Sequence, residues 1–210
     1  MSHRSAVILG SMLVAALTML AARPLCAQAG GEIHEHAAPG TNLRFLTVES
    51  RLPPISLVRD DGRKVSLTGE LNDGRPVVLN FIFTTCPGIC PIMSHTFSVL
   101  QGRLRAKAMP VHLVSISIDP EQDTPERLRE YAKKFSAAKH WQFYTGSVEA
   151  SIAVQQAFGT YGGDKMRHDP VTFMRVAPGT PWERIDGFAS AEQLLIEFTR
   201  LVSTPAIASR

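Results

Sequence analysis

The chain has 210 residues, of which 44% are hydrophobic and 20% are charged. These shares are close to the averages of globular domains, so the chain can bury one sizeable core but not two. Its formal net charge of +3 is too small for the strongly basic surface that binds nucleic acids, and we exclude that class of function.

The N-terminal segment has the pattern of a secretory signal. A basic residue, Arg4, precedes the apolar run 6–22, and Ala27-Gln28-Ala29 resembles a cleavage site. We therefore assign residues 1–29 to a signal peptide, with an uncleaved membrane anchor as the alternative. Both alternatives predict a periplasmic or other extracytoplasmic protein, which is either soluble or held at the membrane by its N-terminal helix.

Cys26 lies inside this signal segment and lacks the small residues that precede a lipidated cysteine. The mature chain therefore keeps two cysteines, Cys86 and Cys90. Residues 30–47 mix Gly, Pro, Ala and charged residues without apolar periodicity. This composition predicts a flexible tether, followed by one domain over residues 48–205.

Two stretches near the start of this domain predict strands. Residues 55–67 alternate between apolar and polar side chains around Asp60-Asp61-Gly62, a pattern typical of a β-hairpin. After Pro76, the apolar run 77–83 is short and rich in strand-forming residues, as in a buried strand. A loop with both cysteines follows, and then apolar residues recur at helical spacing: Met93, Phe97, Leu100 and Leu104.

The rest of the domain alternates strands with helices. The apolar run 111–118 predicts a second buried strand, and Thr124-Pro125 has the N-cap and first-turn proline of a helix start. Further elements are expected as a strand at 141–145, a helix at 147–158, strands at 171–176 and 184–188, and a last helix behind the capping box Ser190-x-x-Gln193. This order predicts an α/β protein of thioredoxin-like layout. Its mixed central sheet is flanked by helices, and the hairpin forms an N-terminal extension.

Cys86 and Cys90 lie where the first buried strand gives way to a helix. Residues four positions apart face the same side of a helical turn, so the two sulfurs can bind one metal ion or each other. The helix N-terminus favours thiolates, which bind metals and exchange disulfides, and Cys86 should benefit most. A purely structural disulfide is the alternative, but so short a loop contributes only about 2 kcal/mol. Two thiolates suit Cu(I), and they suit zinc if two further ligands are present.

The histidines differ in their prospects as a third ligand. Five of them have ordinary explanations as tether, surface or core residues: His34, His36, His95, His112 and His140. His168 differs because it lies in the polar loop 162–169, directly before the strand at Val171, and loops at strand ends often carry sites. A lone loop histidine is more often solvated, so spacing alone leaves the role of His168 open.

Two long motifs carry a family resemblance. The segment 81–91 contains both cysteines, and the segment 117–125 reads Ser-Ile-Asp-Pro-Glu-Gln-Asp-Thr-Pro. Over roughly residues 48–199 the chain resembles the Sco/SenC family of copper chaperones for cytochrome c oxidase. The resemblance implies a thioredoxin fold in which Cys86, Cys90 and His168 bind copper, above all as Cu(I), with Cu(II) as a second form. It also implies a partner, the copper-site subunit of cytochrome c oxidase or another cuproprotein.

Two positions depart from the family pattern. Gly88 stands between the cysteines where the family often has an acidic residue, and Arg167 precedes the histidine where the family often has Asp. Both departures alter the charge near the site, and Asp169 is the remaining neighbour that could orient the imidazole. Because a thioredoxin-like fold places a cis-proline before the strand that faces its cysteines, we also expect a cis Asp169–Pro170 peptide.

The resemblance favours a metallochaperone over an enzyme, because copper can pass by ligand exchange without catalytic turnover. The rival hypothesis is a thiol–disulfide reductase that keeps the cysteines of a copper site reduced. Cys86 would attack the oxidised partner, Cys90 would resolve the mixed disulfide, and a thiol–disulfide reductant would reset the pair. His168 separates the two hypotheses, because a reductase does not need it. A peroxidase is disfavoured, since no activating arginine motif surrounds Cys86.

Overall fold

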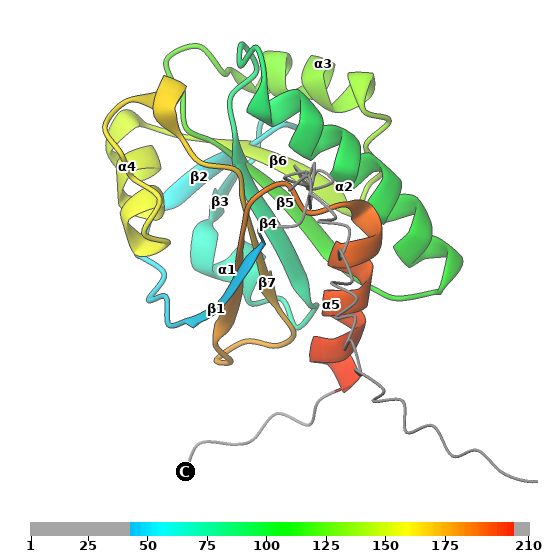
Figure 1. Cartoon of the computed structure of the whole chain (residues 1–210). Coiled ribbons are helices and arrows are strands. Elements are labelled where there is room, and N and C mark those ends of the chain that lie inside the picture. Colours follow the sequence, from blue (N-terminus) through cyan, green and yellow to red (C-terminus); the bar gives the residue numbers. More distant parts are fainter. Residues whose placement is uncertain (1–42, 204–210) are drawn as a thin grey trace, which may run out of the picture. The chain divides into compact units, whose positions relative to one another are not determined.

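The computed structural model describes residues 43–203. They form an eight-stranded sheet with helices packed against it (Figure 1). The strands are β1 (Arg44–Val48), β2 (Ser56–Arg59), β3 (Lys64–Ser66), β4 (Val77–Ile82), β5 (His112–Ser117), β6 (Trp141–Thr145), β7 (Val171–Arg175) and β8 (Trp182–Asp186). The helices are α1 (Leu67–Leu71), α2 (Ile89–Ala106), α3 (Pro125–Lys134), α4 (Val148–Ala157) and α5 (Ala191–Ser203), with a short 3-10 turn, η1, at Lys165–Arg167.

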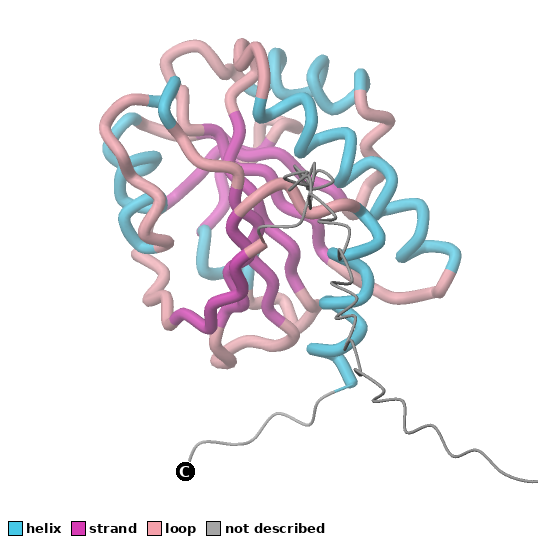
Figure 2. The backbone as a smooth tube through the Cα atoms, in the orientation of Figure 1, coloured by secondary structure: helices cyan, strands magenta, loops and turns pink. Residues whose placement is uncertain are grey.

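The sheet is mixed, as the sequence predicts. Its strands follow the order β1-β8-β7-β4-β5-β6-β2-β3. The pairs β4–β5 and β5–β6 are parallel, and the remaining pairs are antiparallel. Every residue of β4 and of β5 is buried, because helices cover both faces of these central strands (Figure 2). This burial explains why both strands appear in the sequence as largely apolar runs with few exposed polar positions.

Alternate residues of the central strands face two separate cores. On one face, Val78 and Ile82 of β4 pack with side chains of α2, α3 and α5. On the other face, Leu79 and Phe81 pack with side chains of α1 and α4. Successive residues of a strand point to opposite sides, so β4 contributes to both cores. A central mixed sheet covered in this way is the thioredoxin-like arrangement, and the predicted fold class is confirmed.

The helices begin where their capping residues predict. The hydroxyl of Thr124 accepts a hydrogen bond from the Arg127 N–H at the start of α3. At the last helix, the Gln193 N–H donates to the Ser190 hydroxyl, and the Gln193 side chain accepts from the Ser190 N–H. This reciprocal pair is the capping box that the sequence indicates for α5.

Strand β1 lies in the segment that the sequence indicates as the end of a tether. It pairs with β8 from Arg44 opposite Asp186 to Val48 opposite Trp182. Its first four residues are exposed, so β1 lacks the one-sided apolar pattern of a half-buried strand, and backbone pairing holds it instead. Regular structure therefore begins before residue 48.

Within residues 43–203, no helix combines the length and apolarity that a membrane span requires. The predicted signal or anchor at 1–29, with His34, His36 and most of the predicted tether, lies outside the described residues.

The expected cis peptide before Pro170 is wrong. The described residues contain no cis peptide bond, so Asp169–Pro170 is trans. The trans isomer is the intrinsically favoured form of an X-Pro bond. With it, the chain enters β7 in register with β8, and the Pro170 carbonyl accepts a hydrogen bond from the Gly187 N–H at 2.9 Å.

Three loops meet where the central strands β4 and β5 end and β7 begins. The parallel pairing of Ile82 with Ser117 places the ends of β4 and β5 side by side. Strand β7 runs antiparallel to β4, with Thr172 opposite Asn80, so the start of β7 reaches the same edge. The loop with the cysteines after β4, the loop after β5 and the loop with His168 before β7 therefore converge.

Candidate metal centre

The two cysteines lie on either side of the start of α2. The Cys86 N–H donates to the Phe83 carbonyl at 3.2 Å, which closes a turn directly after β4. Gly88 caps the helix without a side chain, and Cys90 is in the first helical turn. Both thiols are free, with Cys86 8% exposed and Cys90 completely buried. Cys86 is therefore the cysteine nearer to solvent, and Cys90 lies in the core below it.

Backbone N–H groups hydrogen-bond to both sulfurs. The Cys90 N–H lies 3.3 Å from Cys86 Sγ, and the Phe83 N–H lies 3.4 Å from Cys90 Sγ. Such donors stabilise thiolates. At Cys90 burial outweighs this effect and raises the pKa of the thiol well above its usual range. A metal that binds Cys90 must therefore displace a firmly held proton.

His168 lies directly after η1, and its imidazole points at the cysteines. Its Nε2 atom is 3.4 Å from Cys90 Sγ. Its Nδ1 atom is 2.7 Å from the Lys165 carbonyl oxygen, which can only accept a hydrogen bond, so Nδ1 carries the proton. The lone pair of Nε2 then faces the sulfurs. The edge of the imidazole also packs against the ring of Phe83, with the centroids 5.3 Å apart.

The structure brings Cys86, Cys90 and His168 together and leaves the other described histidines elsewhere. One ligand atom from each of these three residues lies within 4.8 Å of the others, and no other such group of His, Cys, Asp or Glu occurs in residues 43–203. His95 is exposed on α2, and His140 is half-buried before β6. His112 is completely buried in β5, as its apolar surroundings in the sequence indicate.

Asp169 does not orient the imidazole, since the Lys165 carbonyl takes Nδ1. Asp169 is exposed, and so is Arg167 at the other side of His168. The partner of Nδ1 is thus a backbone oxygen and not a side-chain carboxylate. Sequence reasoning misses this oxygen because a carbonyl acceptor does not depend on residue type.

A buried aspartate braces the loop of the cysteines from the loop after β5. Asp123 is fully buried, and its carboxylate accepts hydrogen bonds from the Thr84 N–H and hydroxyl and from the Ser117 hydroxyl. These charge-assisted bonds fix the turn directly before Cys86. The motif 117–125 is visible in the sequence, but its role as a brace appears only with the fold.

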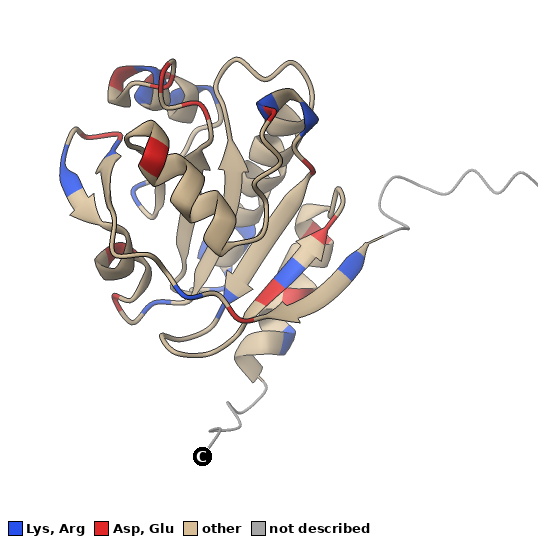
Figure 3. Ribbon diagram, turned by 90° about the vertical axis from the view of Figure 1, so that its left-hand side faces the viewer, with Lys and Arg blue, Asp and Glu red and all other residues tan. Residues whose placement is uncertain are grey.

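A pocket of about 600 Å³ lies beside the site, and His168 is among its lining residues. Its walls include the loop 159–169, residues of α4 and the segment Ile118–Glu121. Figure 3 shows the molecule from the side of α4, with residues of both charge signs spread over the ribbon. The loop that carries His168 borders this pocket, and most of its residues are exposed.

Comparison with known proteins gives a consistent assignment. The SCO1/SenC family model matches residues 49–203. A SCO1 protein homolog of Bacillus subtilis is 36% identical over 100 residues, which cover 47% of this chain and 51% of that protein. The chain spans about half the length of the curated relatives it matches.

Two solved structures show the same fold. The structure of Arabidopsis thaliana ScoI with copper bound has a TM-score of 0.58 and 28% identity, and the match covers 70% of this chain and 97% of that one. The second structure is that of BsSco, which is described as a member of the Sco family of cytochrome c oxidase assembly proteins and as having a disulfide switch. It has a TM-score of 0.63 and 24% identity, and the match covers 75% of this chain and 96% of that one. Because the SCO1/SenC family model matches residues 49–203, which are most of this chain, the chain belongs to the SCO1/SenC family.

Proposed function

We propose that this protein is a copper chaperone that binds Cu(I) through Cys86, Cys90 and His168 and delivers it to an extracytoplasmic copper site such as that of cytochrome c oxidase. The observation that carries the proposal is the convergence of two sulfurs and one imidazole nitrogen within 4.8 Å. The copper-bound state of Arabidopsis thaliana ScoI supports it, as does the description of BsSco as a member of a family of cytochrome c oxidase assembly proteins.

The donor set suits Cu(I) better than zinc. Thiolates and imidazole are ligands of soft, low-coordinate Cu(I), whereas a structural zinc site needs four protein ligands. Among the described residues, no fourth His, Cys, Asp or Glu joins the three. The fourth protein ligand that a structural zinc site would require is thus missing from this part of the chain, and a three-coordinate ion fits the group.

The residues of the site have different roles in binding and releasing the ion. The Lys165 carbonyl holds His168 as the tautomer whose Nε2 can bind a metal. Cys90 is the buried ligand, and it must lose its proton for the ion to bind. Cys86 and His168 lie nearer the surface, so ligands of an acceptor protein can replace them one at a time. Release by ligand exchange then needs no catalytic turnover.

The test is a Cu(I) titration of the reduced full-length protein in competition with a chelator. We expect about one Cu(I) per chain, and strong loss of affinity in Cys86→Ser and in Cys90→Ser. His95→Ala is the matched control, because His95 is an exposed histidine on the same helix, and it should bind as the unchanged protein does. Absence of tight Cu(I) binding in the unchanged protein would overturn the proposal.

A second candidate function is thiol–disulfide reduction of a partner's copper-site cysteines, and the closeness of the two sulfurs, which lie within 4.8 Å of each other, favours it. The Cys86 thiolate would attack one sulfur of the partner disulfide and release the other as a thiolate. Cys90, once deprotonated, would then attack Cys86 Sγ, forming the Cys86–Cys90 disulfide and releasing the second partner thiol. Two electrons pass to the partner, and an external dithiol must restore the pair. The disulfide switch described for BsSco supports this chemistry.

We place the protein outside the cytoplasm because residues 1–29 have the pattern of a secretory signal. The partner in this compartment would be a cuproprotein whose copper ligands are exposed during assembly. Fractionation of cells that express the full chain tests the location, and recovery of the protein with the cytoplasmic fraction would contradict it.

A further inference from the structure

The loop that carries His168 has little packing to hold it in place. Asp164, Met166 and Arg167 are exposed, and the pocket of about 600 Å³ separates the loop from α4. The backbone hydrogen bonds of η1 and of His168 stay within the loop. Something else must fix the imidazole relative to the sulfurs.

Besides the His168 imidazole itself, one side chain connects this loop to the body of the domain. The Lys165 ammonium lies 2.6 Å from Asp119 Oδ2 and 5.8 Å from the centroid of the Phe83 ring. Among the described residues, no other side chain of the segment 161–167 forms an ion pair or hydrogen bond with a residue outside that segment. Asp119 itself is 3% exposed, so the carboxylate is a fixed anchor rather than a mobile surface group.

The anchor is in turn joined to the loop of the cysteines. The Asp119 N–H donates to the Ser117 hydroxyl at 3.0 Å, and its carbonyl accepts from the Asp123 N–H at 2.9 Å. The carboxylate of Asp123 accepts hydrogen bonds from Thr84, two residues before Cys86. A continuous set of hydrogen bonds thus runs from Lys165 to the turn that positions the first sulfur.

Lys165 also contacts the imidazole directly through its backbone. Its carbonyl oxygen accepts the hydrogen bond from His168 Nδ1, so the residue whose side chain is anchored also sets the tautomer of the ligand. We propose that Lys165 is a positioning residue for the copper site, and that the Lys165–Asp119 ion pair holds His168 in register with Cys86 and Cys90. The inference rests on the proposed function, and it adds a residue pair that aligns the two halves of that site.

Two variants with opposite charge changes test the proposal. Lys165→Met removes a positive charge and Asp119→Asn removes a negative one, so an effect of charge alone would move Cu(I) affinity in opposite directions. Loss of the ion pair should weaken Cu(I) binding in both variants, by about 10-fold in Lys165→Met and by less in Asp119→Asn, whose amide oxygen still accepts a neutral hydrogen bond. Lys165→Arg should restore most of the affinity.

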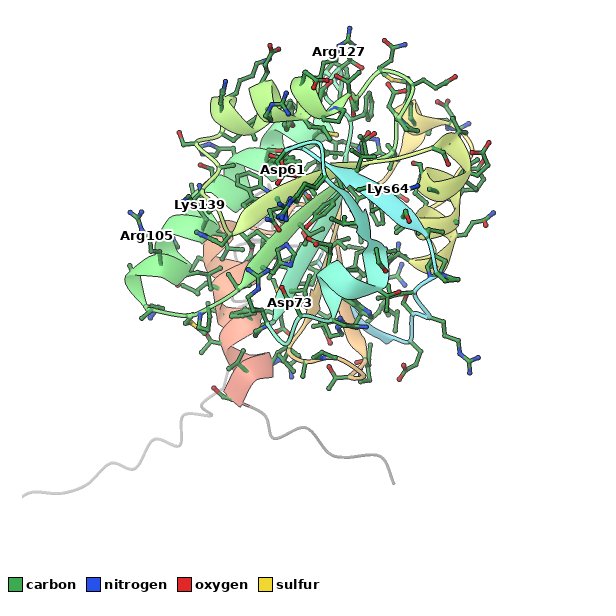
Figure 4. The ribbon with its side chains drawn as sticks, turned by 180° about the vertical axis from the view of Figure 1, so that it is seen from behind. Asp61, Lys64, Asp73, Arg105, Arg127 and Lys139 are labelled. Atoms are coloured by element: carbon green, nitrogen blue, oxygen red, sulfur yellow. The ribbon has the colours of Figure 1, made fainter. Side chains whose placement is uncertain are left out.

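Lys64→Met is the matched control, since it removes the same charge from the exposed strand β3 at the far edge of the sheet (Figure 4). Its Cu(I) affinity should equal that of the unchanged protein. Thermal unfolding of each variant separates loss of alignment from loss of the fold. Lys165 is 39% exposed, so Lys165→Met should unfold near the temperature of the unchanged protein.

A measurement on the metal-free protein is independent of copper. Nitrogen NMR of the His168 imidazole should show the Nδ1–H tautomer in the unchanged protein and a mixture of tautomers in Lys165→Met. Unchanged tautomer and affinity in both variants, or affinities that move in opposite directions, would overturn the positioning role. If the unchanged protein binds no Cu(I), the proposed function fails, whereas the NMR result still decides whether Lys165 positions the imidazole.

Discussion

The Nε2 atom of His168 lies 3.4 Å from the sulfur of Cys90, although the two residues are 78 positions apart in the chain. The contact exists because β7 pairs antiparallel with β4, which brings the start of one strand beside the end of the other. A substitution on the loop of His168 should therefore affect the environment of the cysteines. Copper binding needs the His168 imidazole and disulfide reduction does not, so substitutions of His168 distinguish the two candidate functions.

His168→Ala should weaken Cu(I) binding by roughly 10- to 100-fold, because the ion loses its nitrogen ligand. The side chain is partly exposed in a polar loop, so its removal should cost little free energy of unfolding. Chelator competition measures the affinity, and denaturant unfolding measures the stability. Disulfide exchange with a small-molecule disulfide should continue at nearly the same rate, since thiolate content and access govern that chemistry.

An unchanged Cu(I) affinity in His168→Ala would remove His168 from the site and favour the reductase. His140→Ala is a suitable comparison, because it deletes another partly buried histidine that lies outside the group of ligand atoms. It should change neither copper binding nor disulfide exchange.

Alkylation should distinguish the two cysteines. In the reduced, metal-free protein, Cys86 is slightly exposed and Cys90 is completely buried, and burial raises the pKa of the Cys90 thiol. Each unit of pKa lowers the thiolate fraction about tenfold, so iodoacetamide should modify Cys86 at least about tenfold faster. Mass spectrometry after brief exposure gives the order of modification.

The same experiment in denaturant is the control, and there both cysteines should react at similar rates. Faster modification of Cys90 in the native protein would show that the sulfurs exchange their roles, and that Cys90 is the attacking thiol in any disulfide chemistry.

The stability of the fold should decrease with acid through His112. Burial lowers the pKa of His112 below its ordinary value of 6.5, the charge of Arg75 lowers it further, and Asp73 opposes the shift. The imidazole lies at the end of the sheet near Asp73, which is labelled in Figure 4, and its Nε2 is 3.2 Å from the Tyr144 hydroxyl. Between the lowered pKa and about 6.5, the unfolded chain binds the proton and the folded one does not.

The contribution of His112 to the free energy of unfolding is therefore complete above about pH 6.5 and is lost as the pH falls. Denaturant unfolding from pH 7 to pH 5 should show a loss of stability from this residue, at most about 2 kcal/mol over that range, which His112→Gln should remove. His140→Gln should have a smaller effect, because His140 is only half-buried. A larger effect of His140→Gln would contradict the assignment.

The sequence predicts the central elements of the fold well and its edges less well. Strands β4 and β5 lie in short segments rich in apolar, strand-forming residues, and the cap residues Thr124 and Ser190 mark two helix starts, so local patterns suffice there. Strand β1 escapes prediction, because its pairing with β8 is a long-range backbone interaction that leaves no apolar periodicity.

The site could be predicted only as far as local sequence spacing determines it. Spacing indicates that Cys86 and Cys90 can act together, because a helical turn fixes their separation. Spacing alone does not assign His168, and only the family resemblance singles it out. The Lys165 carbonyl and the Asp119 anchor depend on the tertiary arrangement of two loops, which no local pattern specifies.

Gly88 caps α2 between the two sulfurs, and a Cβ atom added there would have no neighbour within 4 Å. The turn can therefore accept an acidic residue, such as the family often has at this place, without repacking of the core. A carboxylate at position 88 would place a negative charge between the two cysteines, so this position offers space in which the charge around the bound ion can be changed without contact to the core.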